Sequence, residues 1–349
     1  MWDSFTIRRK MNSFSRRMGW TWAPAKPYRA WIVATSRCNL TCKTCPAHAP
    51  VHGTDPNYFT DMKPEVYERV KRELLPGLQI IHLSGGGEPF LTPLLDQMLD
   101  DMADGRRYIT VVTNGTIIRR KAIERLVRSP SLIRVSFDGT TNEINQAIRG
   151  VKLDRILEFL RTVKEFADRG VHPRFLFQVS YVVTRSNVHQ MTEAVEIAHR
   201  YGVHEMCFGN FVVDDRKDEY AMRESLFGCP EEVTPHWQRA HDRGRELGIT
   251  VWPMSFDCKE RSEEERRQYK PDLYDGERIR QCPLPWWSVY VEVNGAVKPC
   301  CVYHWPLGNL LEQPLREIWN GPKFRALRRI VNTPAMPEVC RSCFIQERL

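Results

Sequence analysis

The chain has 349 residues, of which 42% are hydrophobic and 27% are charged, and it carries a net charge of +8. This composition is typical of a soluble globular protein with roughly two domains. No apolar run approaches the ~20 residues of a membrane-spanning helix, which excludes a transmembrane protein, and no secretory signal opens the chain. We therefore expect a cytoplasmic protein whose 11 cysteines serve as metal ligands or free thiols rather than disulfides.

A basic extension, residues 1–28, opens the chain. Its cations are Arg8, Arg9, Lys10, Arg16 and Arg17, and its apolar residues at helical spacing are Ile7, Met11, Phe14 and Met18. The pattern predicts a short amphipathic helix. We expect its apolar stripe to dock on the rest of the protein, and the alternative is contact with a partner or an anionic surface. Elsewhere cations and carboxylates alternate, so we expect no nucleic-acid partner.

Three cysteines follow the first predicted strand, residues 30–34. Cys38, Cys42 and Cys45 have the spacing C-x3-C-x2-C, and no fourth cysteine lies nearby in the sequence. Iron–sulfur clusters are usually held by four thiolates, so three on one loop would leave one iron open to a ligand that is not part of the protein. The alternative is a structural zinc site that His48 completes as fourth ligand.

Beyond this loop, short apolar runs alternate with helical stretches. The predicted strands are residues 80–83, 108–113, 133–137, 175–183 and 205–212. The predicted helices begin at Pro64 and then span residues 93–102, 121–127, 155–168 and 191–200. About six strand–helix units of this kind predict a parallel sheet with crossover helices. Active sites of parallel barrels lie at the C-terminal strand ends.

A second set of cysteines follows a charged bridging segment, residues 214–280. Asn294-Gly295 between two apolar runs predicts a β-hairpin. Four cysteines surround this hairpin or follow it, and they are Cys282, Cys300, Cys340 and Cys343. Four such ligands form a closed site for zinc or for an iron–sulfur cluster. Cys301 competes with Cys300 as the ligand.

Together these motifs resemble the radical S-adenosylmethionine (radical SAM) superfamily with a C-terminal SPASM or twitch region. The first cysteine loop, the turn Gly86-Gly87-Glu88-Pro89 after the second strand, and the second cysteine set carry the resemblance. It implies a partial (β/α)6 barrel over residues 29–213 and a small hairpin-plus-helix auxiliary-cluster domain over residues 281–349. One departure is Thr44, where the family often has an aromatic residue that packs on adenine.

The resemblance also implies cofactors and residue roles. S-adenosylmethionine would bind a [4Fe–4S] cluster held by Cys38, Cys42 and Cys45. An auxiliary [4Fe–4S] cluster would be held by Cys282, Cys300, Cys340 and Cys343. The amino end of the methionine would lie at Gly86, Gly87, Glu88 and Pro89. Ser136 would contact the methionine carboxylate or the ribose, and Arg185 would pair with the carboxylate, which Arg binds bidentately.

The implied chemistry is reductive cleavage of S-adenosylmethionine and abstraction of hydrogen from an unactivated C–H bond. We expect oxidation or epimerisation of a polar small molecule of the sugar or aminocyclitol type, with Cys207 as candidate hydrogen donor and a flavodoxin- or ferredoxin-type electron donor. The alternative is a peptide maturase. We rank it second because many peptide-modifying relatives carry an added leader-binding domain, whereas about 28 residues precede the barrel here. A zinc-binding interaction module without catalysis is the third possibility.

Overall fold

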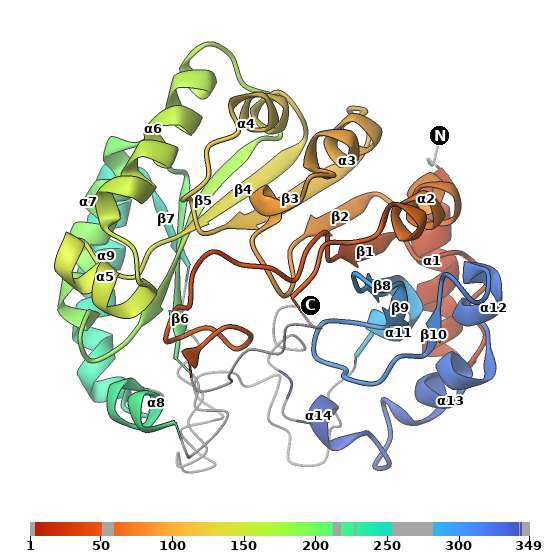
Figure 1. Cartoon of the computed structure of the whole chain (residues 1–349). Coiled ribbons are helices and arrows are strands. Elements are labelled where there is room, and N and C mark those ends of the chain that lie inside the picture. The colour runs from red at the N-terminus through yellow and green to blue at the C-terminus, as the bar shows by residue number, and fades with distance from the viewer. Residues whose placement is uncertain are drawn as a thin grey trace.

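The computed structural model describes residues 4–50, 59–211, 218–226, 228–252, 282–341 and 343. Over these residues the strands form one continuous sheet, in the order β10-β9-β8-β1-β2-β3-β4-β5-β6-β7 (Figure 1). Strands β1 to β7 are all parallel to their neighbours. The parallel sheet that the alternating pattern predicts is therefore confirmed.

The six predicted parallel strands start within two residues of where the sequence places them, and a seventh strand, β7, was not predicted. Their bounds are β1 (Arg29–Ile32), β2 (Ile80–Leu83), β3 (Tyr108–Thr113), β4 (Ser131–Ser136), β5 (Leu176–Val183), β6 (Glu205–Asn210) and β7 (Thr250–Trp252). β2 and β3 have the predicted bounds. β1 ends two residues before the predicted end, and Val212, the predicted end of β6, lies outside the described residues.

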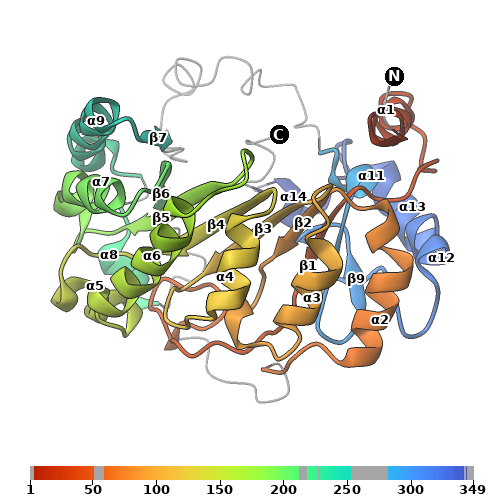
Figure 2. The same cartoon turned by 90° about the horizontal axis from the view of Figure 1, so that it is seen from above.

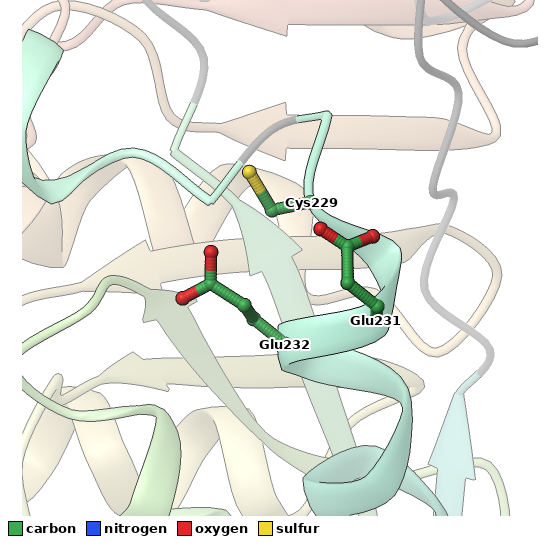
Figure 3. Close-up of side chains that lie close together, drawn as sticks. All are labelled: Cys229, Glu231 and Glu232. Atoms are coloured by element: carbon green, nitrogen blue, oxygen red, sulfur yellow. The ribbon is translucent and has the colours of Figure 1, made fainter.

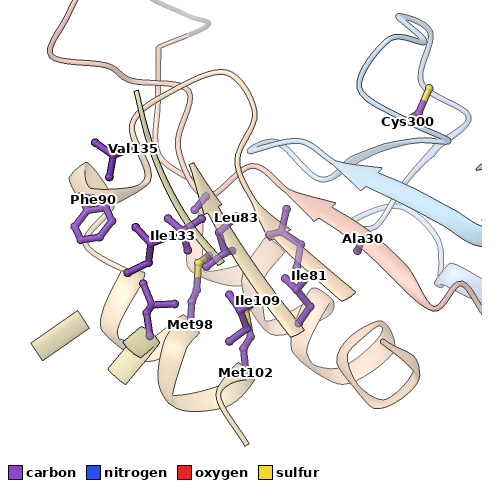
Figure 4. Packing of buried hydrophobic residues seen from close by; sticks show 14 of the residues in the cluster. Ala30, Ile81, Leu83, Phe90, Met98, Met102, Ile109, Ile133, Val135 and Cys300 are labelled. Carbon is purple, nitrogen blue, oxygen red and sulfur yellow. The ribbon is translucent and has the colours of Figure 1, made fainter. Parts of the chain in front are cut away.

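Helices cover one face of the sheet (Figure 2). They are α2 (Pro64–Glu73), α3 (Leu95–Met102), α4 (Arg120–Val127), α5 (Asn142–Arg149), α6 (Leu153–Asp168), α7 (Met191–Arg200) and α9 (Pro230–Leu247), with short 3-10 turns η2 (Leu75–Gly77), η3 (Pro89–Leu91) and η4 (Val188–Gln190). Helix α8 (Glu219–Glu224) lies instead beyond the strand ends, where the Arg185 N–H donates to the Glu224 carbonyl at 2.9 Å. Figure 4 shows Ile81, Ile109 and Ile133 of three strands beside Met98 and Met102 of α3. All five side chains are fully buried, and each stabilises the fold by about 1.5–3 kcal/mol.

The predicted bridging segment continues the sheet in its described part. β7 pairs in parallel with β6, and α9 packs on α7. Gly248, at φ +72°, ends α9 and leads into β7. On this side the sheet is therefore one parallel strand wider than the six predicted units, and the division of the chain into domains stays a prediction.

The C-terminal region joins the same sheet from the other side. Its elements are α11 (Leu284–Trp287), β8 (Ser288–Val291), β9 (Ala296–Lys298), β10 (Gly308–Asn309), α12 (Leu315–Trp319), α13 (Pro322–Ile330) and α14 (Glu338–Arg341). β8 pairs in parallel with β1, and β9 folds back antiparallel on β8. The predicted hairpin at Asn294-Gly295 is thus confirmed, with Gly295 at φ +85°.

Helix α1 (Ser4–Arg17) forms as the amphipathic pattern predicts, but its docking is opposite to our expectation. The apolar stripe is exposed, whereas Asn12 and Ser15 are fully buried. The Asn12 amide explains this orientation, because it donates to the Ala25 and Trp286 carbonyls and accepts from the Ala25 N–H. Among the described residues, none of the helices is long and apolar enough to cross a membrane.

Candidate functional site

The thiols of Cys38, Cys42 and Cys45 lie on the loop after β1, at the C-terminal edge of the sheet. Burial raises the pKa of the Cys42 thiol to about 11, and the nearby Cys45 and Cys38 add to the rise. The three sulfurs are therefore close enough to interact electrostatically. Thiols in such surroundings become thiolates when a metal ion replaces the proton. The loop thus brings three potential ligands of one cluster together.

Amide groups surround two of these sulfurs. The backbone N–H groups of Ala47 and His48 donate to Cys45 Sγ at 3.4 and 3.3 Å. Asn114 Nδ2, just beyond the end of β3, donates to Cys38 Sγ at 3.7 Å. Hydrogen bonds to cluster sulfurs stabilise the negative charge and raise the reduction potential. This environment suits cluster ligands better than inert core cysteines.

Arg149 provides a positive charge beside the loop. Its Nη1 forms a buried ion pair with Asp138 Oδ2 at 2.7 Å. Burial opposes the charge, but Asp138 and then Cys42 raise the Arg149 pKa above its ordinary value. The Arg149 Nε atom is buried without a hydrogen-bond partner among the described residues. A sulfur-rich, negatively charged group at Cys42 and Cys45 would supply both the acceptor and the counter-charge, so these residues fit an iron–sulfur cluster.

The Gly-Gly-Glu-Pro turn packs directly on the backbone that precedes Cys38. A Cβ atom on Gly87 would lie 2.3 Å from the Arg37 carbonyl oxygen, and the Glu88 N–H donates to that same oxygen at 2.8 Å. His48 Nε2 donates to the Gly86 carbonyl at 2.5 Å, so the imidazole that could have completed a zinc site instead connects the loop to the turn. Glycine is needed here because the two backbones touch.

Glu88 is buried and joins the ends of β2 and β3. Its carboxylate accepts from Thr113 Oγ1 and the Asn114 N–H, both at 2.7 Å, and from the Phe90 N–H at 3.0 Å. Burial raises the Glu88 pKa, although these hydrogen bonds oppose the rise. Both carboxylate oxygens therefore already hold protein donors, and the contact between Glu88 and the methionine ammonium group stays a prediction.

Substitution of Gly87 by alanine tests the contact between turn and loop. We expect Gly87→Ala to destabilise the protein by about 1–3 kcal/mol and to lower both the iron content of the first site and the affinity for S-adenosylmethionine, because the methyl group would push the turn off the Arg37 carbonyl. Urea unfolding, iron analysis and equilibrium dialysis measure these effects. The control is Gly209→Ala, where nothing lies within 4 Å of the added Cβ. Wild-type iron and affinity in Gly87→Ala would contradict the role assigned to the turn.

The face of the sheet opposite the helices carries polar side chains in rows. Ser136, Ser180 and Cys207 are register partners across β4, β5 and β6, and the Ser136 and Ser180 hydroxyls are 2.8 Å apart. All three are partly buried. Ser136 thus lies at the C-terminal end of β4 as the sequence predicts, with its hydroxyl paired to a serine that sequence reasoning missed.

Arg185 lies farther out, beyond the end of β5. It forms an ion pair with Glu232, and its Nη2 lies 3.8 Å from Cys229 Sγ. Figure 3 shows Cys229, Glu231 and Glu232 close together at the start of α9, and their ligand atoms lie within 4.8 Å of one another. A cation there would have to displace Arg185. To pair with a cofactor carboxylate, Arg185 would first have to release Glu232. This role of Arg185 stays a prediction.

The second set of thiols also converges. Burial raises the pKa of Cys282 to about 12, and the thiols of Cys300, Cys340 and Cys343 add to the rise. Burial also raises the pKa of Cys300. Cys301, by contrast, is an exposed residue. Burial also raises the pKa of Cys301, but Cys300 and not Cys301 is among the thiols that act on Cys282 and Cys340. Cys300 as the ligand stays a prediction.

The two cysteine sets lie at opposite ends of the neighbouring strands β1 and β8. Ser288 pairs with Arg29 at the N-terminal ends of both strands, and the Ser288 hydroxyl donates to the Pro299 carbonyl at 2.8 Å. Cys300 is therefore near that N-terminal edge, whereas Cys38 follows the C-terminal end of β1.

The fold is a partial parallel barrel. It has a three-thiol loop at one end and a four-thiol set at the other, as expected for an iron–sulfur protein. Residues 32–172 match the Radical SAM superfamily, and residues 282–344 match SPASM, an iron–sulfur cluster-binding domain. The chain belongs to the radical SAM superfamily and carries a C-terminal SPASM domain. It is a radical SAM enzyme whose cofactors are S-adenosylmethionine, a [4Fe–4S] cluster and auxiliary iron–sulfur clusters.

Known proteins resemble the chain over most of its length. The antilisterial bacteriocin subtilosin biosynthesis protein AlbA of Bacillus subtilis is 23% identical over 90% of this chain, which spans 64% of AlbA. The PqqA peptide cyclase of Gluconobacter oxydans is 26% identical over 93% of this chain and 85% of its own length. The crystal structure of Streptococcus suis SuiB bound to S-adenosylmethionine aligns with a TM-score of 0.66 at 18% identity, covering 97% of this chain and 75% of SuiB. The predicted fold is confirmed.

Proposed function

We propose that this enzyme modifies a peptide, by abstracting hydrogen from an unactivated C–H bond of one of its residues. The observation that carries the proposal is the similarity to the PqqA peptide cyclase, which extends over 93% of this chain. AlbA, named for the biosynthesis of a bacteriocin, and SuiB, whose structure was also determined with its precursor peptide SuiA, support the same substrate class. A peptide therefore ranks above the sugar-type substrate that the sequence alone favoured.

The residue roles form part of the proposal. Cys38, Cys42 and Cys45 hold the first cluster, while Cys282, Cys300, Cys340 and Cys343 hold an auxiliary cluster. Gly86, Gly87, Glu88, Pro89 and Ser136 contact S-adenosylmethionine. With cluster and cofactor bound, the site supplies reductive cleavage of the cofactor and hydrogen abstraction from carbon. The remaining residues position the substrate and exclude water, and a flavodoxin- or ferredoxin-type protein supplies electrons.

Cys207 is the proposed hydrogen donor if the outcome is epimerisation. It lies on the polar face of the sheet, in register with Ser180 on the adjacent strand. A thiol there can return a hydrogen atom to a substrate carbon, whereas a serine hydroxyl cannot do so readily because its O–H bond is stronger. Cys207→Ser therefore separates the two outcomes: it stops epimerisation and leaves oxidation or cross-linking intact.

The test uses the reduced, iron-reconstituted enzyme with S-adenosylmethionine and synthetic peptides encoded by short reading frames beside its gene. For oxidation or cross-linking we expect a peptide mass change, and for epimerisation in D2O the uptake of one deuterium. In either case deuterium should pass from a deuterated peptide into 5′-deoxyadenosine. Mass spectrometry detects both. Cys42→Ala enzyme is the control for cofactor-dependent chemistry. Deuterium transfer from sugars or tetrapyrroles but from none of the peptides would overturn the proposal.

A small polar substrate is the second candidate. The AdoMet-dependent heme synthase of Methanosarcina barkeri, which is named for a non-peptide product, is 26% identical over 86% of this chain and 84% of its own length. The polar face would suit such a molecule, because Gln178 donates to Glu205 at 2.6 Å and also accepts from Arg134. The deuterium experiment, repeated with labelled small molecules, decides between the two candidates.

A further inference from the structure

Helix α1 presents an apolar ridge to solvent. Its members Ile7, Met11, Phe14 and Met18 are 47%, 43%, 54% and 55% exposed, and Trp20 just beyond the helix is 50% exposed. The first four recur at three- and four-residue intervals, so they form one continuous strip along the helix. A scattered exposed apolar side chain needs no explanation, but a contiguous strip of this kind marks an interaction surface. We call these five residues the α1 ridge.

The outward orientation of the ridge is fixed by polar contacts on the opposite side of α1. Asn12 Nδ2 donates to the Trp286 carbonyl at 2.8 Å and to the Ala25 carbonyl at 3.0 Å. Its Oδ1 accepts from the Ala25 N–H at 2.9 Å, and the Ser15 hydroxyl donates to the Trp22 carbonyl. Turning α1 to bury the ridge would break these hydrogen bonds, and each of the three buried ones formed by Asn12 costs roughly 1–3 kcal/mol when left unmade.

The end of the helix holds Trp20 on the ridge. Gly19 adopts φ +68°, its N–H donates to the Arg16 carbonyl, and the Trp20 N–H donates to the Ser15 carbonyl. This Schellman pattern commonly brings the second residue past the helix back onto its last turn. The Trp20 and Phe14 rings are accordingly 5.6 Å apart at 88°. Trp286 Nε1 also donates to the Trp20 carbonyl at 3.0 Å, so the aromatic end of the ridge is anchored.

Cations border the ridge. Lys10 and Arg17 lie one helical position from Met11 and Met18 and are exposed, and α1 from Ser4 to Arg17 contains no Asp or Glu. Arg325 of α13 lies nearby, with its Nε 3.5 Å from Thr21 Oγ1. A surface that combines apolar and aromatic side chains with cations is complementary to a partner that is both apolar and anionic.

We propose that the α1 ridge docks this enzyme on the surface of an anionic lipid bilayer, with α1 lying flat at the interface. Tryptophan is enriched at that depth, and each Lys or Arg near an anionic leaflet contributes attraction. A single helix that projects its apolar side chains outward is convex, which suits insertion between lipids. A peptide would instead require a groove. Figure 2 shows α1 at the edge of the molecule, away from β7 and α9, so a flat surface can approach it.

Vesicle flotation tests this proposal on the full-length, cluster-loaded enzyme. The probes are vesicles of phosphatidylcholine alone and of phosphatidylcholine with phosphatidylglycerol. We expect binding to the anionic vesicles that weakens as salt is added. In Phe14→Gln/Met18→Gln the partition coefficient should fall by roughly tenfold or more. In Lys10→Gln/Arg17→Gln it should fall by a similar factor at low salt, with a weaker salt dependence.

The matched control is Val171→Gln/Met222→Gln, which removes two apolar side chains that are 48% and 55% exposed elsewhere on the surface. It should float like the wild type. Equal flotation of wild type and ridge variant would overturn the proposal. The proposal would also be overturned if the wild type elutes as a dimer in size-exclusion chromatography and the ridge variant elutes as a monomer. The ridge would then bind a second copy of the chain. Circular dichroism confirms that each variant is folded.

Discussion

Cys42→Ala should abolish the formation of 5′-deoxyadenosine from S-adenosylmethionine. The first site has three thiols, so the loss of one leaves two, which cannot hold a cluster that already has one iron without a protein ligand. Cys42 is also the most enclosed of the three, because it is buried and lies beside Arg149. We expect the rate of 5′-deoxyadenosine formation to fall by more than the ~10–100-fold that follows substitution of residues outside the ligand set. Anaerobic incubation with dithionite followed by chromatography measures the product.

Iron content shows whether the loss is specific. If the protein holds two [4Fe–4S] clusters, wild type should contain about eight irons and Cys42→Ala about four. Cys300→Ala should also lose about four while keeping the three-thiol loop, and the exposed Cys301→Ala should lose none. A Cys42→Ala protein that still cleaves the cofactor would exclude this loop as the cluster site. Equal losses from Cys300→Ala and Cys301→Ala would reopen the choice between them.

The strands were predictable where short-range pattern and long-range packing agree. β2 and β3 are short apolar runs bounded by turn residues, and both are buried between neighbouring strands. The motif cysteines were predictable because ligand spacing is local in sequence. The alignment of Ser136, Ser180 and Cys207 follows from register, which a single sequence does not reveal.

Two features could not be read from the sequence, for different reasons. The α1 stripe has the pattern of a docked helix, but the buried amide of Asn12 decided the orientation, and a single Asn carries no signal of that kind. β7 is three residues long and follows α9, a charged helix that contains Pro235. Its pairing with β6 therefore depends on tertiary packing that the local pattern does not encode.

Arg149 was missed because nothing in its sequence context distinguishes it from the many surface arginines. It is the last residue of α5, before Gly150 at φ +76°, a position where a basic residue normally compensates the helix dipole. The structure instead buries it against Asp138, whose side chain has no exposed area. Asp138 Oδ1 also accepts from the Val182 N–H at 2.7 Å. The pair thereby connects the end of β4, β5 and the cysteine loop.

Arg149→Met should therefore destabilise the protein by about 3–5 kcal/mol, because removal of one partner leaves a buried carboxylate without its cation. It should also lower the reduction potential of the first cluster, since a positive charge beside Cys42 favours the more negative, reduced form. Urea unfolding and a redox titration followed by electron paramagnetic resonance measure the two effects.

A second substitution and a control separate charge from packing in this prediction. Asp138→Asn added to Arg149→Met removes the stranded charge, so it should recover part of the stability. The potential should also recover part of its loss, because the Asp138 charge acts on Cys42 and its removal offsets the missing cation. Arg155→Met removes an exposed arginine that is ion-paired with Glu158 at 2.7 Å, and it should change stability by less than about 1 kcal/mol. If Arg149→Met costs no more than Arg155→Met, the buried pair does not support the loop. If the potential stays as low in the double variant as in Arg149→Met, the net charge of this pair is not what sets it.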